Sequence, residues 1–475
     1  MSYAQLRMWL FAQLEPDSSL YHQIRVIRWS GPVDLPALER SFSTLVRRHE
    51  VLRARFSFDE GGAYQTVGEE LPLTIPVQDV RRSAGETQEA AAIRDALAVV
   101  ARPFDLQQGP LVRAVLLRLG PAEHHLVLVL HHLATDGWSA RLLLRELCAL
   151  YTAEVTGAPA RLAETTNRFA DYVVRQQEWL QTPAAQTDLS YWREQLRGAA
   201  PLMELPLDRA RPPEAAYQGA QVTFHLPTPT VERLRLLGRS ERVTVFMILF
   251  AAFQATLSRW TASTDLVIGI PVAGRNLLEW EHVVGCFTNT LVLRTDLSGD
   301  PSFRELLRRV RAVVLEGLAH QEFPFERLVQ ELRPARSRNH HPLFQVLFNL
   351  LDFPPPELTV PGVEIEMVPV EELGRAYVDV SMAVERTRDG YAGVVGYDAG
   401  LFHRPTVERL TADYLAVLDT VWADPAMRLS RLPVASDATH AAEDDATARA
   451  LALLERLSED DVRRLLADAA GDRPS

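Results

Sequence analysis

Helical and strand-like patterns of apolar residues alternate from the first residues of the chain. Alternating polar and apolar side chains, or short apolar runs, predict strands at 23–29, 111–117 and 124–131. Apolar residues at helical spacing predict helices at 2–10, 35–49 and 138–156. We therefore expect the first part of the chain to pack helices against a mixed sheet.

A second series of the same kind follows an irregular stretch at about 176–218, which holds a helix with Tyr191 and Trp192 and then several prolines. Strands are predicted at 221–226, 265–270, 290–295, 343–350 and 393–398. Helices are predicted at 244–260, 302–319 and 406–422. The pattern indicates two α/β lobes, which we place at residues 1–174 and 175–436.

The last segment, 437–475, differs in character from both lobes. It begins with polar and acidic residues and continues with two short amphipathic stretches, 448–457 and 460–469. Ser458 and Asp461 have the spacing of a capping box for the second stretch. Such a helical tail is either a docking segment for a partner protein or a frayed extension, and the sequence favours neither.

Composition narrows the class of protein. Of the 475 residues, 47% are hydrophobic and 24% charged, as in a soluble globular protein with a large core. The net charge of −12 provides no overall positive field that would attract nucleic acid or an anionic membrane. Two cysteines, Cys148 and Cys286, cannot build a disulfide framework, which indicates a reducing cytoplasm. Neither a secretory signal nor a bilayer-spanning apolar run is visible.

The stretch HHLATDGWS, residues 131–139, carries the most chemical information. The predicted strand ends in two histidines, and after a short turn Asp136 and Gly137 open the next helix. Because side chains alternate along a strand, His131 and His132 point to opposite faces, so one can face a cleft while the other packs. The ordinary pKa of histidine lies near neutrality, which suits acid–base catalysis. Gly137 allows either a close backbone approach to a ligand or a positive φ.

Other interpretations of these residues have less support. Adjacent histidines recur at 124–125 and 340–341, so a histidine pair can also be a packing feature. His131 and His132 point apart, and Asp136 alone does not complete a three-ligand set, so we expect no metal site. G-x-S-x-G, G-x-x-x-x-G-K-[ST] and G-x-G-x-x-G patterns are absent. Acyl transfer with a histidine base remains as the hypothesis.

HHLATDGWS resembles the HHxxxDG signature of the condensation domains of nonribosomal peptide synthetases, a family built like chloramphenicol acetyltransferase. The other sequence blocks of that family occur here in the same order. They resemble SYAQLRMW (2–9), RRHEVLRARF (47–56), NRFADY (167–172), VGCFTNTLVLR (284–294), HQEFPFERLV (320–329) and SRNHHPLFQVLF (337–348) of this chain. The blocks extend over residues 2–348, which makes the resemblance specific, and the tail lies outside it.

The resemblance implies an α/β fold in which two chloramphenicol-acetyltransferase-like lobes form a V with a central tunnel. Donor and acceptor carrier proteins would dock at opposite mouths, each presenting a substrate on a phosphopantetheine arm. The acceptor amine would attack the donor thioester, which forms an amide and moves the growing chain to the acceptor carrier. A tunnel suits this reaction because it holds both groups together and excludes water. We expect a monomer with no cofactor of its own, and adjacent synthetase domains or modules as further partners.

The resemblance also implies roles at the site. His132 matches the second histidine of the signature, and would act as general base toward the amine or as a hydrogen-bonding stabiliser of the tetrahedral intermediate. The backbone N–H of Gly137 would donate to the developing oxyanion. Both residues are therefore predicted to be catalytic.

Other matched residues are predicted to support the site or to line the tunnel. His131 and Asp136 would support it, with Asp136 in a buried ion pair with the arginine of the fifth block, Arg294. The residues predicted to line the tunnel are Trp138, Ser139 and Asn289, with Trp138 mainly packing.

Alternatives within and outside the family stay open. This chain differs from heterocyclisation domains, which carry DxxxxD in place of the signature, from epimerisation domains, which differ in the later blocks, and from recruitment domains, which usually lose the histidine. Starter-type domains that attach a fatty acyl group stay open. No adenylation motif follows Pro433, so we expect an excised piece or a freestanding or C-terminal enzyme. The leading function is peptide-bond formation between carriers. The alternatives are a freestanding enzyme that forms an ester or uses acyl-CoA, and a noncatalytic platform that docks carriers.

Overall fold

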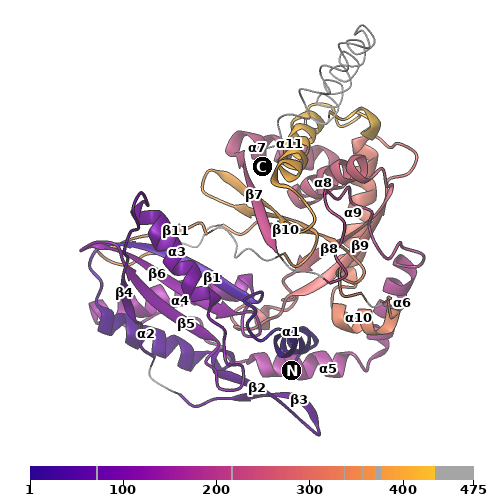
Figure 1. The fold of residues 1–475 in the computed structure, drawn as a ribbon. Coiled ribbons are helices and arrows are strands. Elements are labelled where there is room, and N and C mark those ends of the chain that lie inside the picture. Colours follow the sequence, from indigo (N-terminus) through magenta and orange to yellow (C-terminus); the bar gives the residue numbers. More distant parts are fainter. Residues whose placement is uncertain (71–72, 215–217, 336, 355–357, 371–375, 434–475) are drawn as a thin grey trace, which may run out of the picture.

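The computed structural model describes residues 1–433 apart from 71–72, 215–217, 336, 355–357 and 371–375. The helical tail predicted at 437–475 lies outside these residues. The described chain forms two α/β halves, each built on its own sheet (Figure 1). The mixed α/β fold class and the predicted helices and strands are confirmed, with ends displaced by a few residues.

The first half is built on a five-stranded sheet with strand order β11-β1-β6-β5-β4. Its strands are β1 (His22–Ser30), β4 (Val77–Asp79), β5 (Val112–Arg118), β6 (Glu123–His131) and β11 (Glu364–Val368). Its helices are α1 (Tyr3–Leu14), α2 (Leu35–Arg48), α3 (Gln88–Ala101) and α4 (Gly137–Thr156). A separate hairpin joins β2 (Ala54–Asp59) and β3 (Gly62–Val67). Strand β6, which ends at the first of the two histidines, is thus the central one of its sheet.

Both faces of β6 are buried, and its residues alternate between two cores. Leu126, Leu128 and Leu130 belong to the core that contains α2 and α4. Val127 and Val129 pack with residues of α3 on the opposite face. A strand that is buried on both faces has consecutive apolar residues instead of alternating ones, and the sequence has such a run at 126–130.

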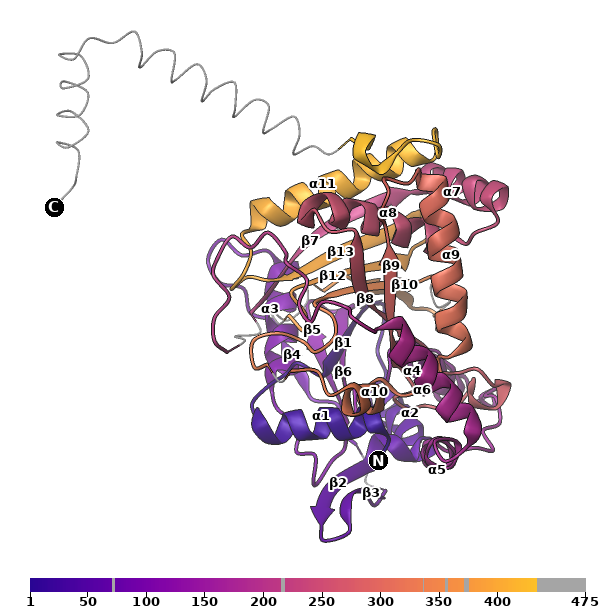
Figure 2. The same ribbon diagram turned by 90° about the vertical axis from the view of Figure 1, so that its right-hand side faces the viewer.

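The second half is built on a six-stranded sheet with strand order β7-β13-β12-β10-β8-β9. Its strands are β7 (Gly219–Pro227), β8 (Asp265–Val272), β9 (Asn289–Asp296), β10 (Val346–Leu351), β12 (Val380–Arg386) and β13 (Gly390–Asp398). Four helices form its main layer, α7 (Thr228–Glu241), α8 (Val245–Thr261), α9 (Phe303–Ala319) and α11 (Arg404–Val421). Figure 2 shows α8, α9 and α11 together on one side of the sheet.

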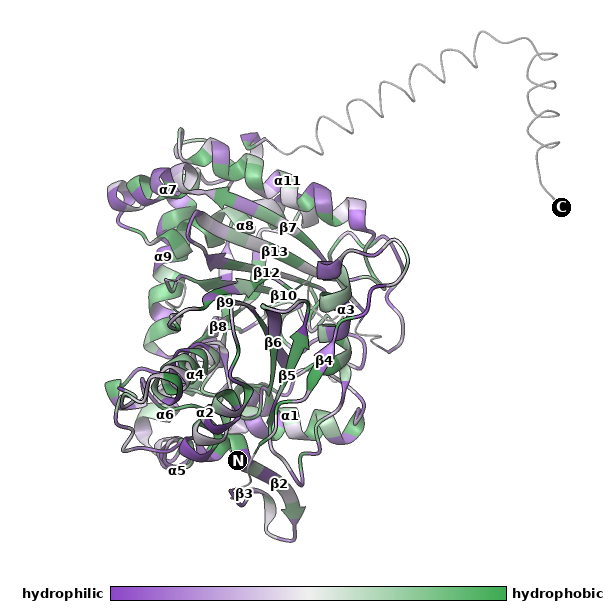
Figure 3. Ribbon diagram, turned by 90° about the vertical axis from the view of Figure 1, so that its left-hand side faces the viewer, coloured by the Kyte–Doolittle hydropathy of each residue, from purple (hydrophilic) through white to green (hydrophobic). Residues whose placement is uncertain are grey.

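Helix α8 is the centre of that layer, since its residues 247–257 are buried. The outer helices α7 and α11 carry alternating hydrophilic and hydrophobic stripes (Figure 3), as expected for helices with one face on the core. No single helix within the described ranges is long and apolar enough to cross a bilayer, and α7 with α8 pass that test only as a pair bent by 98°.

Several segments connect the two halves. Helices α5 (Phe169–Trp179) and α6 (Pro183–Gln195) follow α4 in sequence, and α10 (Phe325–Leu332), which follows α9, contacts α1 of the first half and α6. Strand β11, from the later part of the chain, pairs with β1 in the first sheet. Trp280, Val284 and Phe287 pack into the first core, although β8 and β9 on either side of them belong to the second sheet. The division of the chain at residues 174 and 175 stays a prediction.

Candidate active site

Backbone hydrogen bonds fix the turn that follows β6. The His131 N–H donates to the Leu111 carbonyl at 2.9 Å, and the His132 N–H donates to the Tyr21 carbonyl at 2.8 Å. The Ala134 N–H closes the turn on the carbonyl of His131 at 2.9 Å. His132 is therefore held at a defined place just beyond the sheet.

His131 packs into the body of the first half. Its ring is buried, and Nδ1 accepts a hydrogen bond from the Leu133 N–H at 3.1 Å. The ring lies edge-on to His22 and Phe104, with centroids 5.5 and 5.7 Å away. Burial and the neighbouring cationic groups hold the pKa of His131 well below its ordinary value. A neutral imidazole in these contacts supports the turn.

His132 is half-buried and lies beside residues of the segment that leads into β9. Its Nδ1 is 3.5 Å from the Sγ of Cys286. Burial lowers the pKa of His132 below its ordinary 6.5, and the Asp136 carboxylate opposes this shift only in part. The imidazole is therefore neutral near pH 7, which is the form that can accept a proton.

Asp136 anchors the start of α4 to the segment before β9. Its Oδ1 accepts the Ser139 N–H at 2.8 Å, which caps the helix. Its Oδ2 accepts the Phe287 N–H at 3.0 Å and pairs with Nη1 of Arg275 at 2.6 Å. The side chains of Asp136 and Arg275 are only 1% and 3% exposed, so this is a buried ion pair.

The prediction that Arg294 forms the ion pair with Asp136 is wrong. Arg294 lies on β9 and binds both carboxylate oxygens of Asp265 on β8, each at 2.8 Å. Its Nη1 donates to the carbonyl of Arg197 at 2.7 Å. Arg275 lies upstream of the fifth block, in the loop after β8, and only the folding of this loop back onto α4 brings it to Asp136.

Ser139 belongs to the same buried network. Its Oγ accepts the Gly285 N–H at 3.0 Å and donates to the Gly285 carbonyl at 2.8 Å. Nη2 of Arg275 donates to the same Oγ at 2.8 Å. Ser139 is fully buried and its hydroxyl is bound to Gly285 and Arg275, so the prediction that it lines the tunnel is wrong. It fastens the 275–285 segment to α4 instead.

Gly137 is the first residue of α4, and it has ordinary helical φ rather than the positive φ offered as one alternative. The first N–H groups of a helix have no partner within it. A Cβ added at this glycine would meet nothing within 4 Å, so the backbone here borders open space. Trp138 packs as expected, with Nε1 donating to the Glu281 carbonyl at 2.9 Å and its ring edge-on to Phe353.

Asn289 ties the start of β9 to the loop before α10. Its Nδ2 donates to the carbonyls of Gln321 and Phe323 at 2.9 and 2.8 Å, and its Oδ1 accepts the Phe325 N–H at 3.0 Å. It also borders a small cavity of about 60 Å³ with Tyr172 and Trp280. Lining of a substrate tunnel by Asn289 stays a prediction.

Arg7 and Cys286 are site neighbours that sequence reasoning did not single out. Arg7 reaches from α1 to the Glu326 carboxylate on α10 at 3.1 Å and donates to the Tyr377 hydroxyl. It therefore joins the two halves close to His132, whose pKa its charge helps to lower. Arg7 lies in the matched block SYAQLRMW and Cys286 in the matched block VGCFTNTLVLR. Membership of these blocks is the sequence feature that could have indicated a place near the site.

Gly274 offers a test of how tightly this segment is held. Its φ is +64°, and a Cβ would lie 2.0 Å from the Phe287 carbonyl oxygen. We expect Gly274→Ala to lower the free energy of unfolding by about 3 kcal/mol, from left-handed strain plus overpacking. Gly299→Ala is the matched control, since its φ is +83° with nothing within 4 Å, and should cost about 1 kcal/mol. Equal losses in urea denaturation would contradict the close approach.

Comparison with known proteins identifies the family. The model of the condensation-domain family matches residues 1–442. One of the linear gramicidin synthase proteins of Brevibacillus parabrevis is 40% identical over 442 residues, covering 93% of this chain but 9% of that protein. A dimodular nonribosomal peptide synthase of Bacillus subtilis is 36% identical over 453 residues, covering 93% of this chain and 19% of that protein.

Solved structures agree with this assignment. The X-domain from teicoplanin biosynthesis superposes with a TM-score of 0.80 at 28% identity, covering 91% of this chain and 97% of the other. The SgcC5 protein from Streptomyces globisporus superposes with a TM-score of 0.76 at 28% identity, covering 90% and 99%. With the matched family model and the HHxxxDG turn at the end of its central strand, the chain belongs to the condensation-domain family of nonribosomal peptide synthetases.

Proposed function

We propose that this chain forms an amide bond between a donor acyl or peptidyl thioester and an acceptor amine, both carried on phosphopantetheine arms. The observation that carries the proposal is the neutral imidazole of His132, held just beyond the central strand beside an anchored Asp136. Condensation domains catalyse this reaction in nonribosomal peptide synthesis, and the family assignment supports it here.

The chemistry needs little beyond proton handling and orientation. As the acceptor nitrogen attacks the thioester carbon, it gains positive charge and must lose a proton, which the neutral His132 can accept or stabilise. Negative charge develops on the thioester oxygen, and the N–H of Gly137, which has no hydrogen-bond partner among the described residues, is a donor for it. The C–S bond then breaks, the proton leaves with the thiolate, and the donor arm is released as a free thiol.

The surroundings of His132 favour a reaction shielded from water. Cys286 and Phe287 are each 1% exposed, and the 275–287 segment is fastened to α4 by Asp136 and Ser139. We propose that this segment forms one wall of a tunnel between two lobes arranged as a V. Carrier proteins would approach from opposite ends, so that their arms meet at His132. The cytoplasm is the compartment we propose, in keeping with two free, buried cysteines.

The substrate class can be tested with loaded carriers. The same acyl group is offered to the full chain as a carrier thioester and as free acyl-CoA, with an aminoacyl or a hydroxyacyl group on the acceptor carrier. Intact-protein mass spectrometry then follows transfer. We expect product from the carrier-bound donor with the amine acceptor. Efficient use of acyl-CoA, or product only with the hydroxyl acceptor, would favour the freestanding acyltransferase or the ester-forming enzyme instead.

The lowered pKa of His132 predicts the pH dependence of this transfer. The neutral imidazole is the active form, and burial shifts its pKa below 6.5. The single-turnover rate should therefore stay level from pH 8 down to about 6.5 and fall only at lower pH. Rates would be measured with excess chain over loaded donor, so that carrier binding is saturated. A midpoint of the acid limb above 6.5 would contradict a neutral, desolvated His132.

A further inference from the structure

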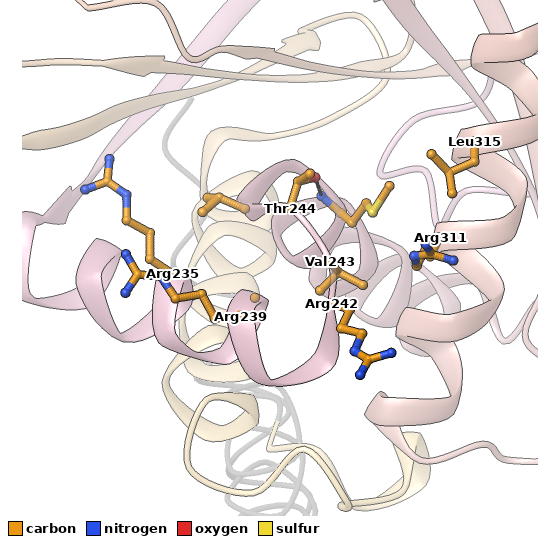
Figure 4. Close-up of a pocket in the computed structure, with 10 residues that line it drawn as sticks. Arg235, Arg239, Arg242, Val243, Thr244, Arg311 and Leu315 are labelled. Carbon is orange, nitrogen blue, oxygen red and sulfur yellow. Dashed lines mark hydrogen bonds between the residues drawn. The ribbon is translucent and has the colours of Figure 1, made fainter.

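A hollow of about 430 Å³ on the helical layer of the second half is ringed by arginines (Figure 4). Its walls come from the end of α7, the start of α8 and the middle of α9. The four arginines are Arg235, Arg239, Arg242 and Arg311. We call this feature the arginine hollow.

Three of these guanidinium groups have no counter-charge. Arg235 pairs with Glu232 at 2.5 Å. Within the described part of the chain, the side chains of Arg239, Arg242 and Arg311 make no hydrogen bond or ion pair, and all three residues are exposed. The neighbouring Glu241 forms an ion pair with Arg304 at 2.8 Å, and none with these three arginines. Like charges this close repel one another, so an anionic partner would be favoured here.

The floor of the arginine hollow is apolar. Val243, Val245, Met247 and Leu315 line it, and Leu315 is 44% exposed. On the neighbouring turn of α7, Leu236 is 62% exposed. Exposed leucines near arginines suit a ligand that has both apolar and acidic groups. A bare anion would leave the leucines exposed to water, and a purely apolar surface would leave the arginines without a counter-charge.

The arrangement of the charges favours an elongated ligand. Arg235 and Arg239 lie one turn apart on α7, Arg242 caps that helix, and Arg311 faces them from α9 (Figure 4). The rise along α7 from Arg235 to Arg242 is about 10 Å, so one phosphate group cannot bridge these two arginines. Carboxylates one turn apart on a helix have the matching repeat.

We propose that the arginine hollow docks an acidic amphipathic helix of a neighbouring synthetase domain. The identity of that neighbour rests on the proposed function. This chain covers only 9% of the linear gramicidin synthase protein that it matches, so in such relatives the matching region has many neighbours along the same polypeptide. The net charge of −12 repels an acidic partner overall, so a local basic patch is needed to bring one into register.

The test measures binding of the full chain to each neighbouring domain of its synthetase, the carrier proteins included, at low and high salt. The variant is Arg239→Glu with Arg311→Glu. The matched control, Arg81→Glu with Arg102→Glu, reverses two exposed arginines of the first half. We expect one domain to bind wild type and control equally and the variant at least tenfold more weakly, with loss of salt dependence. An acid-to-arginine change on that domain should restore binding to the variant.

Two outcomes would overturn the inference. One is that no domain distinguishes wild type from the variant. The other is that millimolar pyrophosphate raises the melting temperature of wild type but not of the variant, while domain binding is unchanged, which would make the hollow a small-anion site. Acyl transfer by wild type in the same samples separates these failures from a failure of the proposed function.

Discussion

Arg275→Ala should lower the free energy of unfolding by about 3 kcal/mol or more. Arg275 is the cationic partner of Asp136, and the side chains are 3% and 1% exposed. Removing it leaves a carboxylate buried with only the N–H groups of Ser139 and Phe287 as partners. A charge left unpaired in the interior is among the costliest single changes. Urea denaturation followed by circular dichroism measures the loss.

The same substitution should slow acyl transfer more than stability alone explains, because the 275–287 segment carries Cys286 to the side of His132 and Phe287 to Asp136. Arg294→Ala is the matched control. Its pair with Asp265 is 24% and 42% exposed, so its loss should cost about 0–1 kcal/mol and leave transfer unchanged. A larger effect at Arg294 than at Arg275 would mean that Asp136 is held in some other way.

The sequence was sufficient to place His132. The apolar run at 126–130 predicts a buried strand, and HHLATDGWS predicts the turn and the start of the next helix. The structure has β6 ending at His131 and α4 beginning at Gly137, with Asp136 as its N-cap. These are local features, set by alternation and capping chemistry over a dozen residues.

The partners of that turn could not be predicted, because they come from far along the chain. Arg275 and Phe287 meet Asp136 across more than a hundred residues. Matching sequence blocks indicates that an arginine is needed but not which one, and the choice of Arg294 was therefore wrong. Ser139 was predicted to line the tunnel for the same reason, since nothing nearby in sequence indicates that its hydroxyl binds the backbone of Gly285.

The contacts that connect the two halves also could not be predicted from local sequence patterns. Strand β11 is short, from Glu364 to Val368, and its pairing with β1 depends on the path of the chain between the sheets. The link from Arg7 on α1 to Glu326 on α10 is set by the same path. Hydrophobic periodicity predicts the elements but carries no information about such pairings.

His132→Ala should lower the rate of acyl transfer by about two to four orders of magnitude, the usual contribution of a general acid–base group. Little loss of stability is expected, because the half-buried His132 side chain forms no ion pair in the described structure and contacts only the nearby backbone of its own turn, at Thr135, and the Cys286 Sγ at 3.5 Å. Its backbone hydrogen bond to Tyr21 does not depend on the side chain. The substitution therefore isolates the imidazole, and Cys286→Ala controls for loss of that contact.

The measurement that bears most directly on the role of His132 is single-turnover transfer from a loaded donor carrier to a loaded acceptor carrier at pH 7.5. Wild type, His132→Ala and Cys286→Ala are compared, with carrier affinities determined on the same samples. We predict an amide on the acceptor with wild type, a rate at least a hundredfold lower with His132→Ala, and equal affinities throughout. Equal rates for wild type and His132→Ala would remove His132 from the chemistry. Carrier binding without any product would make the chain a docking platform.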